Sequence, residues 1–227
     1  MKRIQALSRL DALLAWRRGV IGAAIAVVVM YVILLRLLPE NIASAVLPYL
    51  VFSDPAALGF FFVGGIVLAD RSDGVAAAVL VTPVEPVQVL VARVGTLSAL
   101  GALGGIAIGL ASGVAVRWAS FLPGVLLTAL FYTSFGYAVA VRARSVNEYF
   151  ARATAWAIPL FAPLVLMATG AESWLLALWP TTAAMALLAG TTGVVGLLAT
   201  STLAVATALV GRWALRELET ARREGRA

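Results

Sequence analysis

Long apolar runs recur along this chain, separated by short segments that hold most of its charged residues. The first run, 19–38, contains one charged residue, Arg36. A helix needs about 20 mostly apolar residues to cross a bilayer, and the hydrophobic content of 62% exceeds the about 45–50% of soluble domains. We therefore predict an all-α polytopic membrane protein with six transmembrane helices. The expected spans are 19–38, about 55–70, 94–116, 121–141, about 153–169 and about 183–211.

The positions of the basic residues predict the orientation. With both termini in the cytoplasm, only Arg36 and Arg117 of the 17 basic residues lie outside, as the positive-inside rule requires for short loops. A seventh span is the alternative, because 174–211 is apolar enough for two crossings. That arrangement would place the five arginines of the tail (212–227) outside. Pro180 also interrupts the first half of this stretch. We prefer a short external re-entrant or interfacial helix around 174–188, followed by one span.

We expect a single transmembrane domain, 1–227, with polar segments at its two ends. Apolar residues at helical spacing and several cationic residues predict an interfacial helix in the first 18 residues; a disordered basic leader is the alternative. Residues 212–227 are expected to form a cytoplasmic tail. The second span is expected to begin at Pro55 with Asp54 as its N-cap, and a start near Val46 is the alternative.

The connector between the second and third spans, 70–93, contains more than a simple link requires. Gly74 permits a sharp turn after the second span. The run Thr82-Pro83-Val84-Glu85 has the pattern of a helix start, with an N-cap, a proline at the first position and a glutamate that completes a capping box. We predict a short helix between two bends on the cytoplasmic face. A second box, Ser145 to Glu148, predicts the helix that leads into the fifth span.

Small residues recur at four-residue intervals in the third predicted span. In lipid, helices associate through close packing of small residues more than through hydrophobic burial. This spacing predicts a helix-packing face, although an Ala- and Gly-rich chain also produces such spacings by chance. The four residues are Gly101, Gly105, Gly109 and Gly113.

Several kinds of chemistry are disfavoured by the residue types present. The chain has no Cys and no His, which excludes thiol and histidine catalysis and the usual zinc sites, so we expect no catalytic residue and no metal site. Lys2 is the sole lysine, and a P-loop needs one to reach the phosphates. No acidic residue falls in the middle of a predicted span, which argues against an ion-coupled carrier. The basic residues flank apolar spans, so nucleic-acid binding is not expected.

The connector carries a resemblance to a known family. An acidic–basic pair, a glycine, an apolar run and Thr-Pro together resemble the ABC transporter type-2 permeases, most closely over Phe52-Ser53-Asp54-Pro55 through Arg93. Phe60-Phe61-Phe62-Val63-Gly64 and Val81-Thr82-Pro83-Val84 look especially like the fluoroquinolone-export branch. The resemblance implies the membrane subunit of an exporter in the cytoplasmic membrane of a prokaryote, which moves a hydrophobic or amphipathic small molecule, with a drug as one candidate.

The same resemblance implies partners and sites. ATP and Mg would be bound by a separate ABC ATPase subunit, and a second permease subunit, identical or not, would complete the transporter. The residues that would contact the ATPase are Asp70, Arg71, Asp73, Gly74, Thr82, Pro83, Val84 and Glu85. A substrate path along spans two and five would include Phe60, Phe61, Phe62, Trp156, Phe161 and Met167. An ion-coupled carrier and a non-transporting membrane scaffold are the alternatives.

Overall fold

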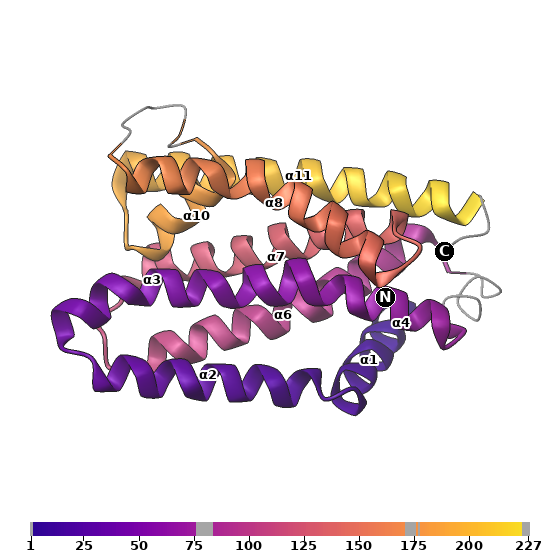
Figure 1. Cartoon of the computed structure of the whole chain (residues 1–227), viewed down its shortest axis with the longest axis horizontal. Coiled ribbons are helices and arrows are strands. Elements are labelled where there is room, and N and C mark those ends of the chain that lie inside the picture. Colours follow the sequence, from indigo (N-terminus) through magenta and orange to yellow (C-terminus); the bar gives the residue numbers. More distant parts are fainter. Residues whose placement is uncertain (1, 76–83, 171–175, 177, 224–227) are drawn as a thin grey trace.

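The computed structural model describes residues 2–75, 84–170, 176 and 178–223. Its long helices lie side by side along one axis (Figure 1). The elements are α1 (Lys2–Arg17), α2 (Val20–Leu37), α3 (Glu40–Ala56), the π-helix η1 (Ala57–Phe62), α4 (Val63–Ser72), α6 (Pro86–Ala111), α7 (Trp118–Arg142), α8 (Val146–Ala168), α10 (Pro180–Leu188) and α11 (Gly193–Arg223).

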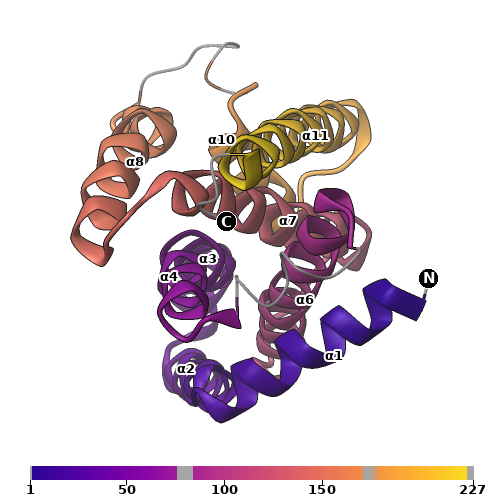
Figure 2. The ribbon, with the colours of Figure 1, turned by 90° about the vertical axis from the view of Figure 1, so that its right-hand side faces the viewer.

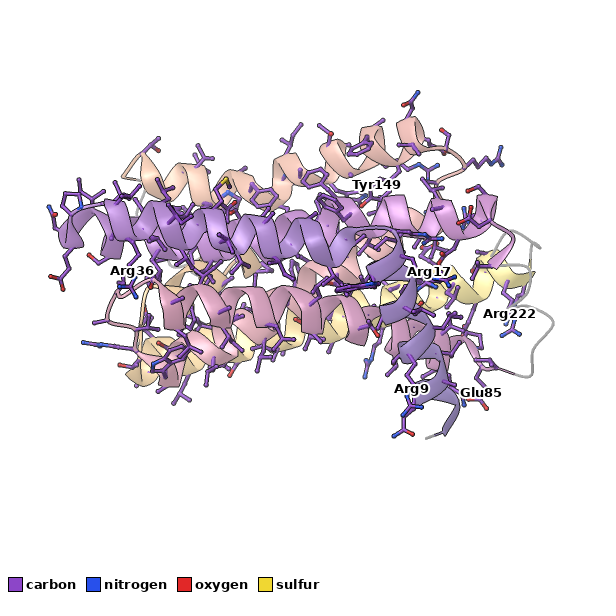
Figure 3. The ribbon with its side chains drawn as sticks, turned by 90° about the horizontal axis from the view of Figure 1, so that it is seen from below. Arg9, Arg17, Arg36, Glu85, Tyr149 and Arg222 are labelled. Atoms are coloured by element: carbon purple, nitrogen blue, oxygen red, sulfur yellow. The ribbon has the colours of Figure 1, made fainter. Side chains whose placement is uncertain are left out.

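Among the described residues, five helices are long and apolar enough to cross a membrane: α2, α6, α7, α8 and α11. The predicted all-α membrane fold is therefore confirmed. We call the end of the bundle that holds α1, the end of α4 and the start of α6 the inner end. Figure 3 shows Arg9, Arg17, Glu85 and Arg222 there, and Arg36 at the opposite, outer end.

The second helical segment begins much earlier than predicted. α3, η1 and α4 run without a break from Glu40 to Ser72. The predicted start at Pro55 is wrong, and the alternative near Val46 is also too late. Leu38 is extended (ψ 147°) because it precedes Pro39, and the turn therefore falls at Pro39. The helix continues past Pro48 and Pro55, since a membrane helix tolerates proline where neighbouring groups satisfy its backbone.

α7 forms the centre of the bundle. Of the residues in its apolar stretch, 83% are buried inside the bundle. The corresponding share is 17% in α2 and in α11, and 11% in α8. Figure 2 shows α7 flanked by α3, α6 and α11, with α2 and α8 at the periphery. The peripheral helices therefore have most of their apolar surface available for lipid or for another subunit.

The ends of the chain are both helical. α1 covers Lys2–Arg17 and lies across the inner end of the bundle (Figure 2), so the alternative of a disordered leader is wrong. Its exposed side combines Leu13 and Trp16 with Arg9 and Arg17, a mixture typical of interfacial helices. α11 extends through 31 residues to Arg223, so the described part of the predicted tail continues the last helix.

The region before α11 holds a short buried helix. α10 has nine residues, about 14 Å of helix, which is too short to cross a bilayer. Pro180 stands at the start of this helix, where proline is well accommodated. Residues 174, 175 and 177 of the predicted 174–188 helix lie outside the described residues. The predicted helix start at Ser145 is confirmed: its hydroxyl accepts a hydrogen bond from the Glu148 amide at 3.2 Å. The Glu148 carboxylate accepts its hydrogen bond from the Arg144 amide at 2.7 Å, one residue before the N-cap amide of a capping box.

Candidate functional site

The two described ends of the connector are shaped by a glycine and a proline. Gly74 follows α4 with φ at +72°, a left-handed conformation that favours glycine. α6 begins at Pro86, preceded by an extended Glu85. The predicted helix start is therefore wrong for Glu85, which lies outside the helix because Pro86 takes the first position. Thr82 and Pro83 lie outside the described residues.

A buried cluster of four charged residues, Asp11, Arg18, Asp70 and Arg93, joins α1, α4 and α6 at the inner end. Asp70 Oδ1 accepts a hydrogen bond from Arg18 at 2.8 Å, and its other carboxylate oxygen pairs with Arg93. Arg93 also pairs with Asp11 at 3.0 Å. We call these four residues the inner ion cluster. Each carboxylate oxygen of Asp70 thus contacts a different arginine.

Burial makes the inner ion cluster sensitive to the loss of any member. The side chains of Asp70, Asp11 and Arg93 are 4%, 10% and 12% exposed. Burial raises the pKa of the Asp11 carboxyl, and the nearby Arg93 only partly opposes this effect. A buried pair of this kind adds little net stability, yet removing one partner costs about 3–5 kcal/mol. The cluster therefore holds α4 in a defined position against α1 and α6.

Two arginines also link the connector to the inner end of α7 and to the inner end of α11. Arg71 donates hydrogen bonds to the carbonyls of Val141 and Ala143, both at 2.6 Å. These carbonyls belong to the end of α7, where the helix leaves its last acceptors unpaired. Arg222 of α11 donates to the Val84 carbonyl at 2.7 Å. Hydrogen bonds therefore link the connector to the inner ends of both α7 and α11.

The residues predicted to contact an ATPase separate into two groups. Asp70 is buried and Arg71 is half-buried, and both make contacts within the chain. Asp73, Gly74 and Glu85 are exposed at the inner end. Asp73 still accepts a hydrogen bond from Arg18 at 2.7 Å while its side chain remains 56% exposed.

The predicted substrate-path residues also differ in their surroundings. Phe60 is buried, Phe61 and Phe161 are half-buried, and Phe62, Trp156 and Met167 are exposed. Phe61 stacks on Phe150 of α8 at a centroid distance of 6.3 Å. Phe161 stacks on Tyr132 of α7 at 5.8 Å with an interplanar angle of 14°. The aromatic residues of η1, α7 and α8 therefore form one continuous contact.

Two buried hydroxyl groups in this region were not among the predicted site residues. Tyr132 and Thr128 lie one turn apart on α7, and neither hydroxyl has a hydrogen-bond partner among the described residues. Buried polar groups are normally paired, so these two call for a functional explanation. Polar residues within the otherwise apolar run 121–141 were the available sequence signal.

The π-helix is held by a residue that the sequence patterns did not single out. The Tyr149 hydroxyl of α8 donates a hydrogen bond to the Phe60 carbonyl of η1. The Tyr149 ring lies directly on Gly64, where an added Cβ would clash with it. Gly136 brings α7 against the backbone of η1, because its Cβ would lie 2.5 Å from the Gly59 carbonyl oxygen. π-Helical turns often occur at functional sites.

Comparison with known proteins decides the family. The chain matches the Fluoroquinolones export permease protein family over residues 2–215. The chain belongs to this family. Two similar proteins are the fluoroquinolones export permease proteins of Mycobacterium tuberculosis strains CDC 1551 / Oshkosh and H37Rv, each 25% identical over 181 residues, 79% of this chain and 73% of the relative. The resemblance inferred from the connector and from Phe60 to Gly64 is therefore confirmed.

Two of the four glycines predicted to pack helices lie at the contact between α6 and α7 of this export permease. An added Cβ at Gly105 would come within 2.9 Å of Val125, and one at Gly109 within 2.8 Å of Phe121. Gly101 is buried on the same helix. Gly113 lies beyond the end of α6 with φ at +80°, so it belongs to the turn before α7.

Proposed function

We propose that this chain is the membrane-spanning subunit of an ABC exporter that moves a hydrophobic or amphipathic small molecule, such as a fluoroquinolone, out of the cell. The observation that carries the proposal is the family match over 2–215. A helical bundle with apolar, exposed outer helices supports it. ATP and Mg would be bound by a separate ATPase subunit, and a second permease subunit would face the peripheral helices.

The proposed topology has six crossings with both termini in the cytoplasm. The continuous helix from Glu40 to Ser72 would be the crossing that joins the five long apolar helices. Figure 3 shows Arg9, Arg17 and Arg222 at the inner end and Arg36 at the outer end. This asymmetry supports a cytoplasmic inner end by the positive-inside rule.

The ATPase is proposed to contact the connector through its exposed residues. Asp73, Gly74 and Glu85 lie at the surface of the inner end, and Thr82 and Pro83 between them would belong to the same contact. The buried Asp70 and the half-buried Arg71 would transmit the movement, since they join α4 to α1, α6 and α7. A push on the connector would then displace these helices as a unit.

The substrate is proposed to pass beside η1 and α8. α8 is the least buried of the long helices, and its contact with η1 and α7 is largely aromatic. Ligand sites of this kind combine apolar and aromatic walls with a few polar groups. Separation of α8 from α7 would expose the Tyr132 hydroxyl, a donor that could bind a carbonyl or carboxylate of the substrate.

Inside-out vesicles that contain the permease with its co-purified ATPase test the proposal. We expect fluoroquinolone uptake that requires ATP and persists when a protonophore dissipates the proton gradient. Uptake by the permease alone, abolished by the protonophore, would instead identify an ion-coupled carrier. A complete lack of uptake, with the ATPase present and active, would favour a scaffold.

A further inference from the structure

A cavity of about 480 Å³ lies between the inner ends of α7, α8 and α11. It is separate from both the connector and the aromatic contact. Its lining is polar and rich in arginine. The lining residues that carry the argument are Arg142, Arg144, Glu148, Arg152, Glu217 and Thr220.

The cavity holds one more positive than negative side chain. Arg142 pairs with Glu217, and Arg152 pairs with Glu148 at 2.6 Å. The Arg144 guanidinium has no hydrogen-bond or ion-pair partner in the described part of the chain. Each pair uses one guanidinium nitrogen, so several N–H donors remain in a space open to an anion. Arginine donors match the oxygens of a phosphate group especially well.

Two tryptophans set the depth of this cavity relative to the membrane. Trp156 lies one turn beyond Arg152 on α8, and Trp213 lies one turn before Glu217 on α11. Because α8 and α11 run in opposite directions (Figure 1), both indoles lie one turn deeper in the bundle than the cavity. Their ring centroids are 5.9 Å apart. Tryptophan concentrates at the membrane–water interface, which puts the arginines at headgroup depth.

We propose that this cavity binds the phosphate headgroup of an anionic phospholipid from the inner leaflet. The Trp156–Trp213 pair would form its membrane-side floor. The exposed apolar residues below it, including Ile158 on α8 and Leu209 on α11, would contact the acyl chains. A lipid fits better than a soluble phosphate because the cavity adjoins apolar faces of two outer helices. Basic cavities between membrane helices on the cytoplasmic side are suited to anionic headgroups.

The tryptophan pair provides a direct measurement. The full chain is placed in phosphatidylcholine vesicles that contain either brominated phosphatidylglycerol or brominated phosphatidylcholine, and fluorescence quenching is recorded. The quenching that comes from the tryptophan pair is the part of the signal that is lost in a W156F/W213F variant. We expect stronger quenching by brominated phosphatidylglycerol. Arg144→Gln should reduce this preference about fivefold, the factor for one basic residue near an anionic surface, and Arg144→Lys should retain most of it.

Arg216→Gln is the matched control, because Arg216 is exposed near the same end of α11 but does not line the cavity. It should leave the preference unchanged. Equal quenching by the two brominated lipids, or equal losses in the two glutamine variants, would overturn the proposal. Displacement by inorganic phosphate alone would assign the cavity to a soluble anion. Loss of the ATPase in Arg144→Gln with unchanged lipid preference would assign it to the partner. These readouts require no transport activity and so are independent of the substrate.

Discussion

Replacing Asp70 by asparagine tests whether the inner ion cluster holds the connector in place. The change keeps the size of the side chain and removes its charge. Arg18 and Arg93 each lose an anionic partner at a position where the carboxylate is 4% exposed. The cluster then carries a net buried positive charge. Loss of one partner from a buried pair costs about 3–5 kcal/mol, and we expect a loss near the lower limit because asparagine still offers a carbonyl oxygen.

The measurement is the free energy of unfolding of the purified permease in mixed micelles. Asp73→Asn is the matched control, since it removes the same charge from a side chain that also pairs with Arg18 but is 56% exposed. Exposed pairs contribute about 0–1 kcal/mol, so this variant should remain close to the wild type. We further expect Asp70→Asn to retain ATPase binding and to lose ATP-dependent transport. A stability within about 0.5 kcal/mol of the wild type, or equal losses in the two variants, would refute the reasoning.

Three further predictions concern single side chains. Tyr132→Phe should leave stability unchanged or slightly improved, because the hydroxyl has no partner among the described residues. The KM for a fluoroquinolone should rise by the factor that corresponds to about 1 kcal/mol of lost hydrogen bonding, and an unchanged KM would remove Tyr132 from the substrate path. Gly105→Ala should cost about 1–3 kcal/mol through overpacking against Val125, whereas Gly95→Ala, where nothing lies within 4 Å, should stabilise α6 slightly; unfolding in mixed micelles measures both, and equal effects would contradict the packing argument. Burial raises the pKa of Asp11 above its ordinary 3.8, so the contribution of Asp11 to stability is greatest below pH 3.8 and is lost as the pH rises through the folded-state pKa. Unfolding measured over a series of pH values should show this dependence in the wild type and not in Asp11→Asn.

Local patterns predicted a large part of the fold. The apolar run 19–38 became α2, and the box at Ser145 became the start of α8. Both predictions depend only on residues that lie a few positions apart in the sequence. Proline positions were less informative, because the same residue can begin, interrupt or lie within a helix. Pro39 separates helix α2 from helix α3, whereas Pro55 lies within α3. Only the packing around each proline distinguishes these outcomes.

The membrane class, the helical content and the family could all be predicted from the sequence, because hydrophobicity, charge asymmetry and short motifs are properties of short stretches of chain. The burial of Asp70, by contrast, follows from tertiary contacts alone. Its partners Arg18 and Arg93 lie far from it in the chain, and no local pattern specifies which buried charges meet. The same holds for the Tyr132 hydroxyl and the arginine-lined cavity, whose surroundings are created by helices distant in sequence.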